Sequence, residues 1–166
     1  MQLAFGLFLL VGSASLQATA LSRPLGGPRP DLVLIVVLAW SMVRGLTEGT
    51  ICGIAGGLAL DLLSAAPFGM HTVLLGSIGA VTALGETNLY RGNVPLFLIT
   101  AALATVLFHG GSLLALQAAG MQTYGLGHFV QFVVPTSLVN AVLMPLAFTL
   151  VQRAVRALGG WRQLEL

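Results

Sequence analysis

Charged side chains are scarce in this chain, and most of them fall in the gaps between long apolar runs. The 166 residues include seven arginines, no lysine and five acidic residues, so charged residues make up 7% of the sequence. Typical soluble proteins contain about 25%. A water-soluble fold of this size needs more polar side chains than this sequence contains to cover its surface. The sequence therefore predicts a protein that is surrounded by lipid.

Six apolar runs approach the length of a membrane-spanning helix, which needs about 20 residues to cross a hydrocarbon core of about 30 Å. Each gap between the runs contains Gly, Pro or Asn, which end helices. The second run is short for a full crossing. The pattern predicts one all-α integral membrane domain over residues 1–166, a bundle of about six transmembrane helices. We expect these helices at residues 3–22, 31–44, 47–64, 70–87, 94–118 and 131–152.

The first apolar run has an alternative interpretation as a signal peptide. The small residues of Ser13-Ala14-Ser15 and Ala18-Thr19-Ala20 are typical of cleavage sites. However, no basic residue precedes the run, whereas a signal peptide normally begins with a basic segment. We therefore favour a membrane helix here. Removal of the segment would leave the orientation of the other helices unchanged.

The arginines predict which side of the membrane each loop occupies. If the amino terminus is cytoplasmic, more arginines lie inside than outside, in agreement with the positive-inside tendency. The inner segments would then hold Arg44, Arg91, Arg153, Arg156 and Arg162, and the outer loops would hold Arg23 and Arg29. We therefore expect both termini in the cytoplasm.

Residues that carry catalysis or bind metals form no recognisable constellation in the sequence. The single cysteine, Cys52, has no second ligand at metal spacing and is expected to be an inert, packed thiol. His71, His109 and His128 lie in different segments, and HExxH, CxxC, GxSxG and Walker-type motifs are absent. Basic patches with interleaved aromatics, which are typical of nucleic-acid binding, are absent as well. We expect no enzyme activity, cofactor, metal or nucleic acid, although scattered helices can assemble a membrane active site.

Glycines recur along one face of the third predicted helix. Gly49, Gly53 and Gly57 are spaced every four residues, and Gly56 lies beside them. Such a smooth face lets another backbone approach closely and gain van der Waals contact. The face either packs against another helix of the same chain, which we favour, or receives the membrane helix of a partner.

Asp61 is the most unusual polar residue, because a carboxylate within an apolar helix is costly in lipid. It lies near the outer end of the third helix, and His71 opens the next helix nearby. A structural carboxylate would accept hydrogen bonds from Ser64 or from backbone N–H groups of the following turn. A functional carboxylate would relay protons or bind a cation with His71, but a relay needs further ionisable groups and this helix offers only Glu48 at its far end. We favour the structural role.

Two further polar residues lie inside predicted helices. Asn140 is near the middle of the last helix, between Pro135 and Pro145, where prolines leave backbone carbonyls that need other donors. We expect Asn140 to form a hydrogen bond to another helix. His109, in the fifth helix, is expected to be a satisfied interior histidine.

The order and separation of three stretches are typical of one known family. The stretches are Pro30-Asp31-Leu32-Val33-Leu34, then Leu60-Asp61-Leu62-Leu63-Ser64-Ala65-Ala66-Pro67-Phe68-Gly69 after the glycine face, and Val139-Asn140-Ala141-Val142-Leu143-Met144-Pro145-Leu146 followed by Arg153 and Arg156. In these stretches and in its length, the chain resembles MreD, the membrane subunit of the bacterial rod-shape system. The first and fifth helices add little to the resemblance.

The resemblance implies a six-helix, multi-pass protein of the bacterial inner membrane that binds MreC and has no catalytic activity. Its further partners would be a RodA-type glycosyltransferase, a class B penicillin-binding protein, MreB at the cytoplasmic face, and membrane lipid. The family also resembles the substrate-binding (S) components of ECF vitamin transporters, which implies an S-component-like bundle. The structural or partner-binding candidates are Pro30, Asp31, Gly49, Gly53, Gly57, Asp61, Ser64, Pro67, Gly69, Asn140 and Pro145.

Two other classes of function stay open. A vitamin-binding subunit of an ECF-type transporter needs a concave outer pocket with several converging polar groups. The outer loops offer only a small set for this purpose, namely Gln122, Thr123, Tyr124 and His128. A membrane enzyme or lipid-handling protein is the third class, and the absence of a catalytic motif argues against it.

Overall fold

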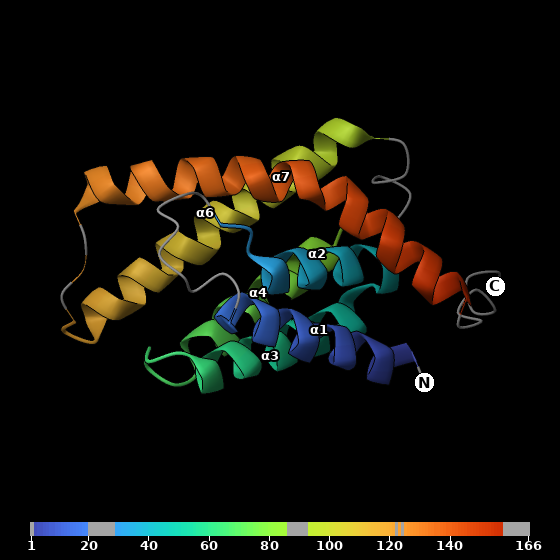
Figure 1. Cartoon of the computed structure of the whole chain (residues 1–166), viewed down its shortest axis with the longest axis horizontal. Coiled ribbons are helices and arrows are strands. Elements are labelled where there is room, and N and C mark those ends of the chain that lie inside the picture. The colour runs from blue at the N-terminus through green and yellow to red at the C-terminus, as the bar shows by residue number, and fades with distance from the viewer. Residues whose placement is uncertain (1, 20–28, 86–92, 122, 124, 158–166) are drawn as a thin grey trace.

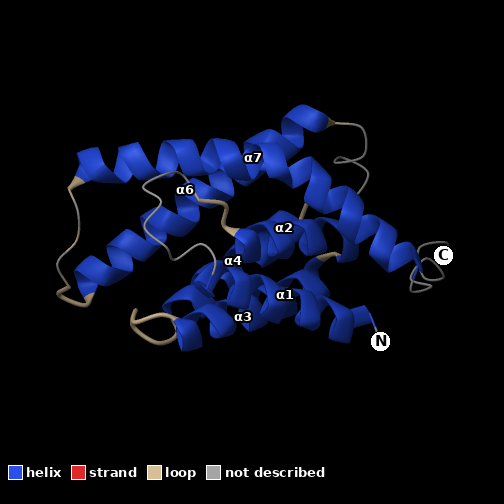
Figure 2. Ribbon diagram, viewed as in Figure 1, coloured by secondary structure: helices blue, strands red, loops and turns tan. Residues whose placement is uncertain are grey.

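The computed structural model describes residues 2–19, 29–85, 93–121, 123 and 125–157. Within these ranges the chain forms six helices and no strand, which confirms the all-α prediction (Figure 1, Figure 2). The helices are α1 (Gln2–Thr19), α2 (Leu32–Arg44), α3 (Leu46–Leu63), α4 (Met70–Ala83), α6 (Val94–Ala118) and α7 (Leu126–Ala157).

The predicted boundaries agree well for the central helices. The helix expected at 94–118 matches α6 at both ends, and α2 and α3 begin and end within one residue of their predicted limits. α4 ends earlier than predicted, because the N–H group of Leu84 turns back to the carbonyl of Val81. The expected ends of the first and fourth helices, at 22 and 87, lie outside the described residues.

The last helix is longer than predicted at both ends. α7 begins directly after Gly125, whose carbonyl accepts the first backbone hydrogen bonds of the helix, and it continues past residue 152 because Val155 is buried against the core. Pro135 and Pro145 lie inside it without ending it. Figure 1 shows that α7 bends in its carboxy-terminal half, where Pro145 removes a backbone donor.

α2 lies in the middle of the bundle. It packs against α1, α3, α4, α6 and α7, and ten of its 13 residues are buried. The side chains of α2 are apolar around almost the whole helix, as expected for a helix that is buried on all sides. This placement explains why the second apolar run is so short, since a helix of 13 residues is about 20 Å long and need not face lipid.

Three of the described helices are long and apolar enough to cross a membrane: Leu46–Leu63, Pro95–Ala118 and Leu126–Ala157. Shorter apolar helices occupy Gly6–Gln17, Leu32–Arg44 and Met70–Ala83. The structure thus supports a membrane protein, while six complete crossings remain a prediction. α1 begins and α7 ends at the same end of the bundle (Figure 1). The orientation of that end relative to the cytoplasm also remains a prediction.

The glycine face of α3 is internal, as we favoured. A methyl group added at Gly53 would overlap the backbone carbonyl of Leu75, and one at Gly57 would overlap the backbone of His71 and Thr72, all in α4. A methyl group at Gly49 would collide with Ser41 of α2. The alternative in which this face receives a partner's helix is therefore wrong. Cys52, which lies on the same helix, is a free and fully buried thiol.

Candidate functional site

The carboxylate of Asp61 binds the first turn of α4. Its Oδ2 accepts hydrogen bonds from the backbone N–H groups of Gly69 and Thr72, both at 3.0 Å, and from the Thr72 hydroxyl at 2.6 Å. Its Oδ1 accepts the backbone N–H of His71 at 3.0 Å and lies 2.9 Å from Nδ1 of the His71 ring. The side chain of Asp61 is fully buried. We call Asp61, Gly69, His71 and Thr72 the α4 cap.

The local sequence explains how the α4 cap forms. Ser64 has an extended backbone that ends α3, and Gly69 has a φ of 94°, a left-handed conformation that glycine adopts at low cost. Between them, the carbonyl of Pro67 accepts the N–H of Met70. The first N–H groups of a helix have no partner within the helix and favour a negative charge. The tight turn brings the end of α3 beside these groups, so that Asp61 satisfies them.

Of the two kinds of donor that the structural interpretation allowed for Asp61, the structure shows the backbone of the turn. Gly69, in the predicted turn, does donate to the carboxylate. Ser64, the other donor considered, does not take this role, since its hydroxyl accepts the N–H of Ala66 at 3.4 Å. The structure also brings His71 to Asp61, as the competing functional interpretation required. At the other end of α3, Glu48 is bound by Arg44 and by the Trp40 indole.

Asp31 forms a second cluster that joins three helices. The residue precedes α2, and its own N–H donates to Oδ1 of Asn140 in α7 at 2.9 Å. Its Oδ2 accepts the Asn140 amide at 2.9 Å and lies 3.0 Å from Nε2 of His109 in α6. The Asn140 amide also donates to the hydroxyl of Thr105 at 3.0 Å. We call Asp31, Thr105, His109 and Asn140 the α2 clamp.

Every polar side chain of the α2 clamp has a partner, as buried polar groups require. Asn140 and Thr105 are completely buried, and the Thr105 hydroxyl donates a hydrogen bond to the carbonyl of Ala101. The predictions for Asn140, as a helix-to-helix hydrogen bonder, and for His109, as a satisfied interior histidine, are both confirmed. Sequence reasoning missed that Asp31 is their common partner.

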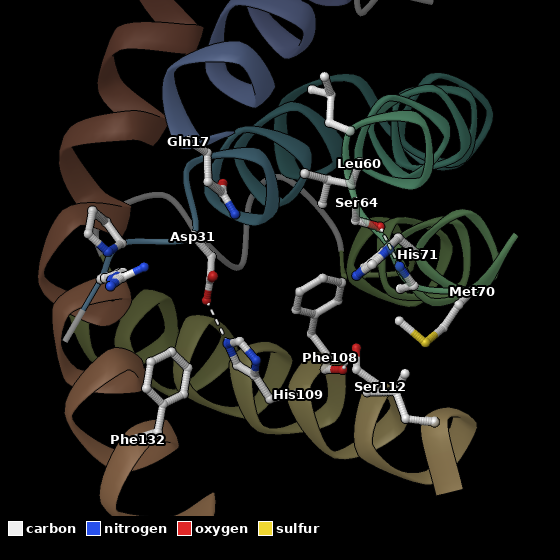
Figure 3. A pocket seen from close by; sticks show the side chains of 15 residues that line it. Gln17, Asp31, Leu60, Ser64, Met70, His71, Phe108, His109, Ser112 and Phe132 are labelled. Carbon is white, nitrogen blue, oxygen red and sulfur yellow. Dashed lines mark hydrogen bonds and ion pairs between the residues drawn. The ribbon is translucent and has the colours of Figure 1, made fainter. Parts of the chain in front are cut away.

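A cavity of about 470 Å³ lies between the two clusters (Figure 3). The ring of Phe108 stands between the two histidines, with ring centroids 5.7 Å from His71 and 5.4 Å from His109. The cavity is lined by Gln17, Arg29, Pro30, Asp31, Leu60, Leu63, Ser64, Ala66, Met70, His71, Phe108, His109, Ser112, Leu116 and Phe132.

The remaining candidates lie in or around these clusters. Pro30 and Ser64 line the cavity, whereas Pro145 lies further along α7. Of the loop residues considered for an outer pocket, Gln122 and Tyr124 lie outside the described residues, and Thr123 bonds to Gln117. His128 lines a separate cavity of about 320 Å³. The polar residues around the cavity of about 470 Å³ are therefore different from the predicted ones.

Sequence reasoning missed Gln17 and Ser112 as cavity residues and used Arg29 only for topology. A polar residue at the end of an apolar run was the available signal for Gln17 and Arg29. Ser112 lies within a long apolar helix, where nothing in the sequence indicates that it faces a cavity. Across the described residues, no group of three or more His, Cys, Asp or Glu side chains is arranged to hold a metal ion.

Comparison with known proteins identifies one family. The family model described as rod shape-determining protein MreD matches residues 1–155. No curated protein and no solved structure matches the chain. The predicted likeness to ECF S components therefore remains a prediction.

Proposed function

This chain belongs to the MreD family of rod shape-determining membrane proteins, and we propose that it is a non-catalytic component of the bacterial elongation machinery. In this proposal it lies in the inner membrane as a multi-pass protein, binds MreC directly and supports lateral peptidoglycan synthesis. The family match over residues 1–155 carries the proposal, because it covers nearly the whole chain. A RodA-type glycosyltransferase and a class B penicillin-binding protein would join the same assembly, with MreB at the cytoplasmic face.

The position of the glycines narrows the surface that MreC can use. Since the glycine face of α3 is filled by α4 and α2, the membrane helix of MreC must lie on another side of the bundle. Apolar side chains are exposed on the surface of α3, α6 and α7. Well-separated examples are Leu58 on α3, Leu107 on α6 and Val142 on α7.

Cysteine cross-linking tests the proposal and locates the interface. Because Cys52 is the only cysteine in the sequence, Cys52→Ala gives a cysteine-free background. Single cysteines at positions 58, 107 and 142 would then be combined with cysteines along the membrane helix of MreC. We expect disulfide cross-linking from one face and none from the other two. Failure of MreC to cross-link from any face and to co-purify with the unmodified protein would contradict the proposal.

The proposed orientation has its own test. A reporter fused after Leu166 should be active only in the cytoplasm, and one inserted at Gly26 should be active only outside. The distribution of arginines supports this arrangement. Activity of the carboxy-terminal fusion in the periplasm would overturn the orientation.

The cavity supports a second candidate function, that of a small-molecule-binding subunit related to ECF-type transporters. Such a subunit needs converging polar side chains in a concave site, and the cavity between the α4 cap and the α2 clamp has them. A vitamin retained through purification would favour this function. Co-purification of a partner with one membrane helix and a coiled coil favours the MreC proposal.

A further inference from the structure

His71 in α4 and His109 in α6 both line the cavity, and each is paired with a carboxylate in the same way. Nδ1 of His71 is 2.9 Å from Asp61, and Nε2 of His109 is 3.0 Å from Asp31. An ionised carboxylate only accepts hydrogen bonds, so the proton of each neutral ring lies on this nitrogen. The opposite nitrogens, Nε2 of His71 and Nδ1 of His109, are then acceptors, and no residue in the described ranges binds them.

The ring of Phe108 separates these two acceptors. It stands between the imidazoles (Figure 3), with ring centroids 5.7 Å from His71 and 5.4 Å from His109. One small group, such as a single metal ion, therefore cannot reach both free nitrogens. A ligand that uses both must carry two hydrogen-bond donors, joined by a spacer that passes the Phe108 ring.

The charges around the cavity favour donors that are cationic. Each imidazole has a carboxylate behind it, Asp61 in one pair and Asp31 in the other. Arg29 also lines the cavity, but it is a single guanidinium against two carboxylates and already has a partner. Charges interact strongly where the surroundings are apolar. A neutral imidazole that donates to a carboxylate is also a more basic acceptor at its other nitrogen, which suits an ammonium group.

The cavity wall beside the two imidazoles is largely apolar. Leu60, Met70, Phe108 and Phe132 line it, and aromatic rings attract cations as well as packing against methylene groups. A volume of about 470 Å³ is in the size range of small-molecule sites. The cavity lies at the end of the bundle where α3 ends and α2 and α4 begin, which favours a water-soluble ligand over a membrane lipid.

We propose that the cavity binds an aliphatic terminal diamine in its diammonium form. One ammonium group donates to Nε2 of His71, the other donates to Nδ1 of His109, and the methylene chain between them lies against Phe108. The inference goes beyond the proposed role in the elongation machinery, because it concerns a ligand of the isolated chain and holds whether or not the chain binds MreC.

Binding is tested by titration calorimetry on the intact protein, purified in a nonionic detergent. The probes are the terminal diamines from diaminopropane to diaminooctane, with the alkylamines and the terminal diols of the same chain lengths as controls. We expect affinity to peak at one or two neighbouring chain lengths of diamine. At the peak, the diamine should bind about tenfold more tightly than the matching alkylamine, the gain of one charge-assisted hydrogen bond. The matching diol should bind more weakly than either amine.

Two substitutions each remove one acceptor and keep a ring in its place. In His71→Phe the carboxylate of Asp61 keeps its backbone donors, and in His109→Phe that of Asp31 keeps the Asn140 amide. Either variant should bind the best diamine no more tightly than the matching alkylamine, while the alkylamine still binds at the remaining histidine. His128→Phe is the matched control, because His128 lines a different cavity, and it should keep the full preference for the diamine.

A pH series on the unmodified protein needs no variant to fold. Besides the two histidines, the charged groups that face the site are Asp31, Asp61 and Arg29. Protonation turns each imidazole from an acceptor into a cationic donor, so diamine affinity should fall as the pH is lowered from about 8 to about 5. An affinity that stays constant or rises over this range overturns the proposal. So does the absence of diamine binding, a diamine that binds no better than its alkylamine or its diol, or a histidine variant that keeps the preference for the diamine.

Discussion

The α3–α4 hairpin and the junction of α2 with α6 and α7 hold helices together in different ways. In the hairpin, Gly53 and Gly57 bring two backbones into direct contact, and Asp61 closes the end of the hairpin from eight to eleven residues away. At the junction, two buried residues that are 109 positions apart in the sequence meet: Asn140 accepts the backbone N–H of Asp31 and donates to the carboxylate of Asp31. The hairpin depends on glycines, which have no side chain, whereas the junction depends on the polar groups of particular side chains.

This difference follows from the solvent. Lipid chains are as apolar as the helices, so burial of apolar surface provides little drive for helices to associate within a membrane. Close packing and interhelical hydrogen bonds must supply the attraction instead. The comparison therefore predicts that the hairpin is most sensitive to added volume and the junction to lost polar groups.

Added volume in the hairpin should have the largest effect. Gly53→Leu and Gly57→Leu would place a side chain where the backbone of α4 now lies, and no rotamer avoids the overlap. We expect most of the protein to be lost from the membrane fraction, as measured by immunoblotting. Gly12→Leu is the matched control, because a side chain at Gly12 of α1 meets nothing within 4 Å. Normal levels of both hairpin variants would refute the proposed close contact.

Removal of the Asn140 amide from the junction should have the second-largest effect. Asn140→Leu leaves the N–H and carboxylate of Asp31 and the hydroxyl of Thr105 without their partner in a buried site. We expect a loss of about 2–4 kcal/mol, which thermal unfolding in detergent would show as a lower midpoint. Thr149→Val, which changes an exposed hydroxyl of the same helix, should unfold like the unmodified protein. Equal midpoints for the two variants would show that the junction contributes no stability.

Substitution of Asp61 should have a smaller effect than substitution of Asn140, because Asp61 lies at a helix end rather than in the middle of the bundle. Asp61→Leu removes every acceptor from the α4 cap and should reduce membrane abundance. Asp61→Asn keeps an acceptor oxygen and should be mild. Cell shape and protein abundance in a strain that depends on the variant distinguish the roles. A stable Asp61→Asn protein that fails to maintain rod shape would show that the negative charge itself has a function.

The smallest effects should come from single hydroxyl groups, one in each region. Thr72→Val removes one hydrogen bond to Asp61, and Thr105→Val removes an acceptor from Asn140. Each should cost about 1 kcal/mol, with the larger cost at the completely buried Thr105. Thermal unfolding of the two variants side by side checks the order. The reverse order would contradict the view that the junction depends more strongly on polar groups.

The two regions also differ in how far they could be predicted from sequence. The glycine spacing and the Asp61 turn are local patterns, so both could be recognised before the structure was known. The partners of Asp31 could not be recognised, because the pairing with Asn140 and His109 depends on how three distant helices cross. For the same reason the cavity was missed: Gln17, His71 and Ser112 have nothing in common in the sequence and meet only in the fold. The length of α7 was underestimated at both ends, because neither the hydrogen bonds to the carbonyl of Gly125 nor the burial of Val155 could be recognised from the apolar run at 131–152.

The unequal lengths of the outer helices affect the surrounding bilayer. α6 and α7 have 25 and 32 residues and are long enough for a full hydrocarbon core, but α4 has 14 residues, about 21 Å, and still exposes Val73 and Val81 on its surface. Hydrophobic mismatch of this kind is relieved by thinning of the adjacent bilayer. The protein is therefore expected to have a thick side and a thin side. Neighbouring proteins with short membrane helices would gather preferentially beside α4, which would give the assembly a lateral polarity that needs no specific contact.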